Sequence, residues 1–337
     1  MRGFLMSGQR AVGAVVAALA TFTAGNAFAQ SAPNAQAVAR WPEKPVHVYL
    51  GFAAGGLPDT VGRLVQQKLA ERWGVQVIMD NRPGAGGITA ADIVARAAPD
   101  GYSLHLSDAS VIAVNPFTYP KLNYSERDFE AVSIVARSPL FLAVNSSVPV
   151  ANFQELIALA RARPGELSYG SSGIGTVHHL SMEALNLAFG VQIMHVPYKG
   201  TGQSVPAMVS GQVAMVFSAY PSLASYARDG RVRLIAENQA RRSSLAPNVP
   251  SVAEMGAPGF DYAVTNGYMV PAGTPREIIQ RISQSMAEVV KLPDIVERFT
   301  ALGIEPVGST PEEHAAAWKS DTERFSRIVR AARVRAE

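Results

Sequence analysis

The segment from Val46 to Thr60 reads VHVYLGFAAGGLPDT, and it indicates the fold class of the chain. VHVYL is a short run rich in β-branched and aromatic residues, as expected for a strand. A glycine-rich stretch follows, and Pro58 with Asp59 then fits the first turn of a helix. A strand, a loop of small residues and a helix in this order predict an α/β fold.

The same order recurs along the chain. Further strands are expected at residues 75–80, 102–108, 141–145, 166–172, 191–198, 213–219 and 232–237. Helices are expected at residues 61–73, 88–98, 153–165, 177–190 and 204–209. Such alternation is typical of mostly parallel sheets with helices on their faces. Because the series starts again near Leu140, we predict two α/β domains.

The tail is predicted to be helical. Thr274-Pro275-Arg276-Glu277 and Thr310-Pro311-Glu312-Glu313 each place Thr at the cap, Pro at the first helical position and Glu at the third. Trp318, Phe325 and Ile328 fall on one face of the last helix. We interpret that face as a docking surface rather than a ligand site.

The N-terminus has the pattern of a secretory signal peptide. Two arginines precede the apolar run AVGAVVAALA, and Ala27-Phe28-Ala29 is a small-x-small cleavage pattern. We predict a signal peptide at residues 1–29, cleaved after Ala29, which sends the protein to the periplasm. A membrane anchor is the less favoured alternative because the apolar run is short. Residues 30–40 are small and polar and are expected to be a flexible leader.

Composition excludes several classes of function. The chain contains no Cys, so disulfides, a lipid-modified N-terminal Cys and sites built on Cys ligands are excluded. Its formal net charge is +3, and loss of Arg2 and Arg10 with the signal peptide leaves +1. This near-neutral balance argues against a nucleic-acid partner. After residue 30, no apolar run is long enough to span a membrane.

The first glycine-rich loop fails the two phosphate-binding motifs that it suggests. Its glycines, Gly51, Gly55 and Gly56, do not have G-x-G-x-x-G spacing, and the loop lacks the lysine of a P-loop. Ligands of open α/β sheets bind beyond the carboxyl ends of strands, and free amides at a helix start attract anions. The stretch from Phe52 to Gly56 is therefore a candidate pocket wall. A tight turn capped by Asp59 is an equally weighted alternative.

A second loop has the same character. YGSSGIGTVHHL, from Tyr169 to Leu180, again follows a strand and enters a helix, and it adds hydroxyls at Ser171, Ser172 and Thr176. Two such loops in two domains could hold an anion with amides and hydroxyls. A serine nucleophile is disfavoured, because GSSGI does not match the G-x-S-x-G elbow.

Acidic and histidine residues offer no metal or catalytic site. His178 and His179 point in different directions on a helix, and His179 with Glu183 lacks a third ligand nearby. We therefore expect hydrogen-bonded or surface histidines. Glu312 and Glu313 are explained by their helix start, so no acid/base pair is nominated.

Three further places are candidates at strand ends. In HVPYKGTG, Tyr198 could line a pocket and Lys199 could attract a carboxylate, although a packed Tyr beside a solvated Lys explains the segment equally well. Ser107 and Ser110 follow one predicted strand, and Ser218 lies at the end of another.

Several motifs together resemble a known family, the substrate-binding proteins of tripartite tricarboxylate transporters, or Bug-type proteins. The motifs that carry the resemblance are WPEKPVHVYLGFAAGGLPDTVGRL, DNRPGAGG, APDGYSL, NP, ARARPGELSYGSSGIGTVHHL, HVPYKG, NVPSVAEMGAPGF and PAGTP. They occur in the family's order from Trp41 to about Pro275.

The resemblance implies a periplasmic, two-domain Venus flytrap protein, with a ligand cleft between the domains. It implies that this protein delivers a carboxylate, whether a di- or tricarboxylate or an aromatic carboxylate, to membrane permease subunits. Domain 1 would comprise residues 41–139 plus 260–337, and domain 2 residues 140–259. We expect a monomer with no cofactor, no metal and no enzymatic activity. The predicted ligand-binding residues are Phe52, Ala53, Ala54, Gly55, Gly56, Asp59, Ser107, Ser110, Ser171, Ser172, Gly173, Thr176, Tyr198, Lys199 and Ser218.

The sequence departs from the family pattern in two places. The first loop reads GFAAGG where relatives usually read PFPPGG, and LSDAS, residues 106–110, places Asp108 near the presumed cleft. Two other functions stay open: a receptor of the same fold that signals to a membrane sensor, and a secreted hydrolase.

Overall fold

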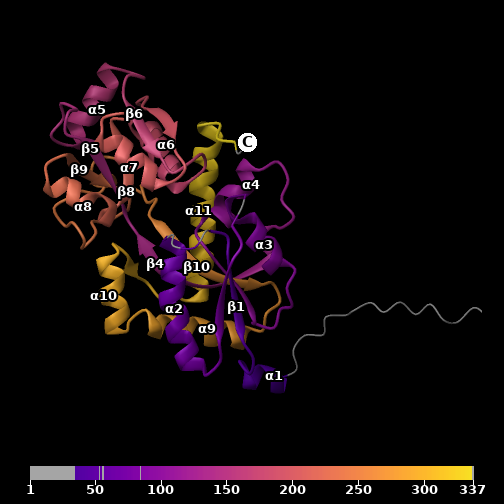
Figure 1. The fold of residues 1–337 in the computed structure, drawn as a ribbon. Coiled ribbons are helices and arrows are strands. Elements are labelled where there is room, and N and C mark those ends of the chain that lie inside the picture. Colours follow the sequence, from indigo (N-terminus) through magenta and orange to yellow (C-terminus); the bar gives the residue numbers. More distant parts are fainter. Residues whose placement is uncertain (1–34, 53, 55–56, 84, 336–337) are drawn as a thin grey trace, which may run out of the picture. The chain divides into compact units, whose positions relative to one another are not determined.

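The computed structural model describes residues 35–52, 54, 57–83 and 85–335 (Figure 1). The predicted signal peptide, the first part of the leader, and Ala53, Gly55 and Gly56 lie outside the described residues. Within the predicted leader, residues Ala35–Arg40 form helix α1. The flexibility of that segment stays a prediction.

The first sheet has six strands in the order β11-β4-β10-β3-β1-β2. Its strands are β1 (Val46–Leu50), β2 (Val77–Asn81), β3 (Ser103–Ser107), β4 (Phe129–Ser138), β10 (Val264–Pro271) and β11 (Glu305–Pro306). β1 pairs in parallel with β2 and β3, whereas β10 is antiparallel to β3 and β4. β11 is also antiparallel to β4.

The second sheet has five strands in the order β7-β6-β8-β5-β9. Its strands are β5 (Leu140–Asn145), β6 (Ser168–Ser171), β7 (Met194–Pro197), β8 (Met215–Ala219) and β9 (Val232–Glu237). β6 is parallel to β7 and β8, and β5 is antiparallel to β8 and β9.

The expectation of mostly parallel sheets is therefore wrong, because the first sheet has two parallel and three antiparallel pairings and the second has two of each. The cause is the path of the chain. β4 leads directly into β5 of the other sheet, and β10 brings the chain back to pair antiparallel with β4. Because β10 runs in the opposite direction to β3 and β4, it pairs antiparallel with both of them.

Helices cover both faces of each sheet. The remaining bounds are α2 (Leu57–Trp73), η1 (Ala85–Gly87), α3 (Ile88–Ala95), η2 (Ser110–Val114), α4 (Asn115–Thr118), η3 (Glu126–Asp128), α5 (Phe153–Ala162), α6 (Val177–Phe189), α7 (Thr201–Val209), α8 (Tyr220–Arg228), α9 (Arg276–Val289), α10 (Pro293–Ala301) and α11 (Pro311–Ala331). α2, α9 and α10 share one core with the first sheet, and α3 contributes to another core, against which the partly buried Tyr49 of β1 packs. α5 and α6 share a core with the second sheet, and α7 and α8 belong to a further one. In the part of the chain that is described, no helix has the length and apolar character needed to cross a membrane.

The two predicted Thr caps have different outcomes. Thr310 forms a complete capping box with Glu313 at the start of α11, as predicted. The cap at Thr274 is wrong, because α9 begins at Arg276 and makes no side-chain cap hydrogen bond. The Thr274 hydroxyl instead donates to the Pro271 carbonyl at 2.7 Å.

The last helix, α11, packs on elements of both sheets. Trp318 is buried in a core with Val111 and Met269, which belong to the first-sheet region. Phe325 and Ile328 are buried in the core that contains Leu142 and Tyr169 of the second sheet. The predicted docking face is confirmed.

Candidate functional site

The loops after β1 and β3 begin at the same edge of the first sheet. These strands are parallel neighbours, and their last paired residues are Leu50 and Leu106. Those candidate residues of both loops that the structure describes are therefore brought to one edge.

The loop after β1 is held by a close approach of two backbones. A Cβ added to Gly51 would lie 2.4 Å from Cα of Gly87, so only glycine fits here. The carbonyl of Phe52 accepts a hydrogen bond from Nδ2 of Asn81 at 3.1 Å, and Ala54 is exposed. Gly51 therefore allows the loop after β1 to pack closely against the backbone at Gly87.

The carboxylate of Asp59 is buried and hydrogen-bonded to other side chains of the protein. The residue is 3% exposed. One carboxylate oxygen accepts a hydrogen bond from Nδ2 of Asn81 at 2.9 Å, and the other accepts one from Nε of Arg63 at 2.9 Å. Asn81 therefore joins the start of α2 to the loop, and the contact with Asp59 raises the pKa of Arg63.

The loop after β3 is organised around Asp108. Its carboxylate accepts hydrogen bonds from the backbone amide of Ser110, at 2.9 Å, and from the Ser110 hydroxyl. Ser107 is 2% exposed, and its hydroxyl donates to the Asp108 carbonyl. Burial raises the pKa of Asp108. Both predicted serines therefore hold the loop, and Asp108 places an acid at this sheet edge.

The loop after β6 requires glycine for its backbone angles. Gly173 and Gly175 have φ of 131° and 77°, which other residues rarely adopt. Thr176 is the N-cap of α6, and its hydroxyl accepts from the His179 amide and donates to the Gly173 carbonyl. The loop thus turns sharply from strand to helix.

Two serine–histidine contacts define the polar side chains of this loop. Oγ of Ser171 lies 2.6 Å from Nε2 of His195, and Oγ of Ser172 lies 2.7 Å from Nδ1 of His178. Ser171 is only 1% exposed, whereas Ser172 is partly exposed. The ring of His195 also stacks on His179, with centroids 3.9 Å apart.

These histidines are neutral at pH 7. Burial lowers the pKa of His178 and His195 to about 4, and burial together with His195 lowers that of His179 to about 3. Hydrogen-bonded or surface histidines were expected at positions 178 and 179, and both are hydrogen-bonded, but no role was expected for His195. The pairing of Tyr169 with His195 across β6 and β7 is what brings it to Ser171.

The other candidates of the second sheet have different surroundings. The Tyr198 amide donates to the Ser171 carbonyl at 3.2 Å, so this tyrosine lies beside the loop. Lys199 is exposed. Ser218 is fully buried, and its hydroxyl has no hydrogen-bond partner among the described residues. β8 is parallel to β6, so Ser218 lies toward the same edge of the sheet.

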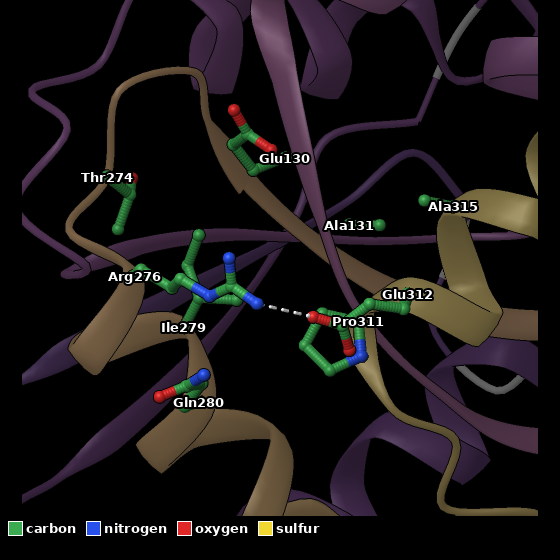
Figure 2. Close-up of a pocket in the computed structure, with 9 residues that line it drawn as sticks. All are labelled: Glu130, Ala131, Thr274, Arg276, Ile279, Gln280, Pro311, Glu312 and Ala315. Atoms are coloured by element: carbon green, nitrogen blue, oxygen red, sulfur yellow. Dashed lines mark hydrogen bonds and ion pairs between the residues drawn. The ribbon is translucent and has the colours of Figure 1, made fainter.

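A separate hollow of about 330 Å³ lies between β4, α9 and the start of α11 (Figure 2). Arg276 and Glu312 form an exposed ion pair across it at 3.1 Å. None of the candidate residues lines it. Across the described ranges, no group of three or more His, Cys, Asp or Glu could hold a metal ion.

Comparison with known proteins identifies the family. Residues 61–334 match the family described as "Tripartite tricarboxylate transporter family receptor". Protein BugT of Bordetella pertussis is 33% identical over 292 residues, which are 86% of this chain and 90% of BugT. The structure of R. palustris Rpa4515 with adipate has a TM-score of 0.75 and 31% identity, over 88% of this chain and 99% of that chain. The structure of MatC of Rhodopseudomonas palustris with bound malate has a TM-score of 0.71 and 29% identity, over 86% of this chain and 100% of that chain.

These similarities confirm the predicted family and the α/β fold class of periplasmic solute-binding proteins. The bounds of the two domains and the ligand-contacting residues stay predictions. The chain belongs to the tripartite tricarboxylate transporter receptor family.

Proposed function

We propose that this protein captures a carboxylate-bearing small molecule in the periplasm and delivers it to the permease subunits of a tripartite tricarboxylate-type transporter. The observation that carries the proposal is the loop of residues 170–176, within a chain of this family. Its glycines and the partly exposed Ser172 suit an anion that is bound by amides and hydroxyls. Adipate, in the Rpa4515 structure, and malate, in the MatC structure, are both dicarboxylates.

The domain bounds are part of the proposal. Domain 1 comprises residues 41–139 plus 260–337, and domain 2 residues 140–259. Support comes from the strands, since the first sheet is built from residues 46–138, 264–271 and 305–306. The predicted ligand contacts come from both domains, so ligand binding favours a closed state. We further propose a monomer, with residues 1–29 cleaved after Ala29.

We infer that the protein is not an enzyme, although Ser171 and His195 have the spacing of a nucleophile and a base. Ser171 is 1% exposed, and its hydroxyl is also within hydrogen-bond distance of the Gly173 amide and carbonyl. A His195 with a pKa of about 4 is a weak base at neutral pH. These features support a structural use of the pair.

Thermal-shift measurements with adipate, malate, citrate and benzoate test the proposal. A ligand at 100 times its Kd stabilises the folded state by about 2.7 kcal/mol, so at least one carboxylate should raise Tm. If none does, the carboxylate proposal fails. Turnover of an ester substrate would instead favour a hydrolase.

A bulky side chain at Ser172 tests the location of the site. Ser172→Trp should abolish the ligand-induced rise in Tm and leave the Tm of the free protein nearly unchanged. Ile174→Trp is the matched control, because Ile174 is 45% exposed in the same loop. A large loss of Tm in the free Ser172→Trp protein would support a purely structural loop.

A further inference from the structure

Among the three hydroxyls of the loop after β6, Ser172 differs from the other two. The Thr176 hydroxyl donates to a carbonyl and accepts from an amide. The Ser171 hydroxyl is buried and is shared between His195 and backbone groups of Gly173. Ser172 is partly exposed, and its hydroxyl is in contact with Nδ1 of His178. It is therefore the hydroxyl that can still turn its proton toward a ligand.

The direction of the Ser172–His178 hydrogen bond decides what this hydroxyl can offer. A neutral imidazole carries one N–H, and a serine hydroxyl carries one proton. If Nδ1 of His178 accepts, the Ser172 proton points at the ring and a ligand meets only an oxygen. If Nδ1–H of His178 donates, the Ser172 proton is free.

An ionised carboxylate accepts hydrogen bonds and donates none. A carboxylate at Ser172 therefore requires the arrangement in which His178 donates. The neighbouring His179 is fixed in the opposite sense, because its Nδ1 accepts from the Gly175 amide at 3.0 Å. No backbone group fixes Nδ1 of His178 in this way among the described residues.

We infer that His178 is a positioning residue that donates from Nδ1 to Ser172 and so turns the Ser172 hydroxyl into a donor for the ligand carboxylate. The inference rests on the proposed function. It goes further by naming the residue that makes Ser172 present a hydrogen-bond donor to an ionised acid.

The matched variants are His178→Asn and His178→Asp, because the Asn and Asp side chains have the same shape as each other. Asn can donate to Ser172, whereas an ionised Asp can only accept and would take the Ser172 proton. The probe is whichever of adipate, malate, citrate and benzoate raises Tm most, and its Kd is measured by calorimetry. We expect His178→Asn to keep Kd within about threefold and His178→Asp to weaken it about tenfold or more.

A Ser172→Ala background separates this effect from the added negative charge. If His178 acts through Ser172, the loss caused by His178→Asp should be at least about fivefold smaller when Ser172 is already Ala. An equal loss in both backgrounds would overturn the inference. Circular dichroism and the Tm of each free protein check that the variants fold.

Nitrogen-15 NMR of the histidine rings reads the tautomer directly. The His178 signals are assigned by their absence in His178→Asn. With ligand bound, Nδ1 should be protonated and Nε2 unprotonated; protonation at Nε2 alone would overturn the inference. If Ser172→Ala binds the probe as tightly as the unaltered protein, this inference fails and carboxylate binding stands. If the unaltered protein binds none of the four acids, the proposed function fails and this inference fails with it.

Discussion

The loop after β1 and the loop after β6 share a sequence pattern but are stabilised in different ways. Both follow a strand, contain several glycines and enter a helix. In the first loop, Gly51 allows contact with the backbone of Gly87. In the second loop, Gly175 has open space around it and a φ of 77°. Glycine provides space in one loop and backbone freedom in the other.

Their polar side chains differ in the same way. The acid of the first loop region, Asp59, is satisfied by Asn81 and Arg63 inside the protein. In the second loop, the hydroxyl of Ser172 contacts the side chain of His178, and Ser172 as a residue is partly exposed. The polar side chain of the first loop therefore supports the fold, whereas Ser172 of the second loop is open to the ligand contact proposed above.

The largest expected effect concerns the glycines. Gly51→Ala should lower the free energy of unfolding by about 3 kcal/mol, because the new Cβ meets backbone that cannot move aside. Gly175→Ala should cost only about 1 kcal/mol, from its positive φ. Urea denaturation measures both.

Asparagine distinguishes the two causes. Asn adopts positive φ more readily than Ala, so Gly175→Asn should recover part of the loss at Gly175. Gly51→Asn should be no better than Gly51→Ala. If Gly51→Ala costs less than Gly175→Ala, the two loops do not differ as described.

A smaller effect is expected at Asp59. Asp59→Ala should cost about 2 kcal/mol, because one of the two hydrogen bonds that Nδ2 of Asn81 donates loses its buried acceptor. Asp92→Ala is the control, since Asp92 forms the same i,i+4 pair with Arg96 at 3.0 Å but in a more exposed position. It should change stability by less than about 0.5 kcal/mol. Equal losses in the two variants, measured by urea denaturation, would contradict the anchoring role of Asp59.

Local patterns predicted the units of the fold well. VHVYL forms β1 at the residues expected, and Thr310 caps α11. β4 and β10 were not among the expected strands. β10 pairs with β4, and this pairing joins Val264 to Ser138, which are more than a hundred residues apart in the sequence. Gly267 and Pro271 lie within β10, and both residue types are uncommon in strands, so the sequence pattern of this strand is weak. Neighbouring residues carry little information about such long-range pairs.

The candidate site shows the same limit. Glycine and hydroxyl patterns identified the loop at Ser172, because the strand, turn and helix are local. The contacts of Ser171 with His195 and of Asp59 with Asn81 depend on strands that come together only in the fold. Sequence spacing does not encode these partners, so the supporting residues were not predicted.

The smallest effect concerns pH and the second loop. The pKa of His195 is about 4 in the folded protein and 6.5 is its ordinary value, so the unfolded chain binds more protons between these limits. The contribution of the neutral His195 ring to the free energy of unfolding is fully present above pH 6.5 and is lost as the pH falls toward 4. Between pH 7 and pH 5, these two pKa values correspond to about 1.8 kcal/mol, and the partial solvent exposure of His195 reduces the expected loss to about 1 kcal/mol. His195→Gln cannot titrate, so its stability should fall less over this range; an unchanged pH dependence would show that the ring beside Ser171 is protonated as easily in the folded protein as in the unfolded chain.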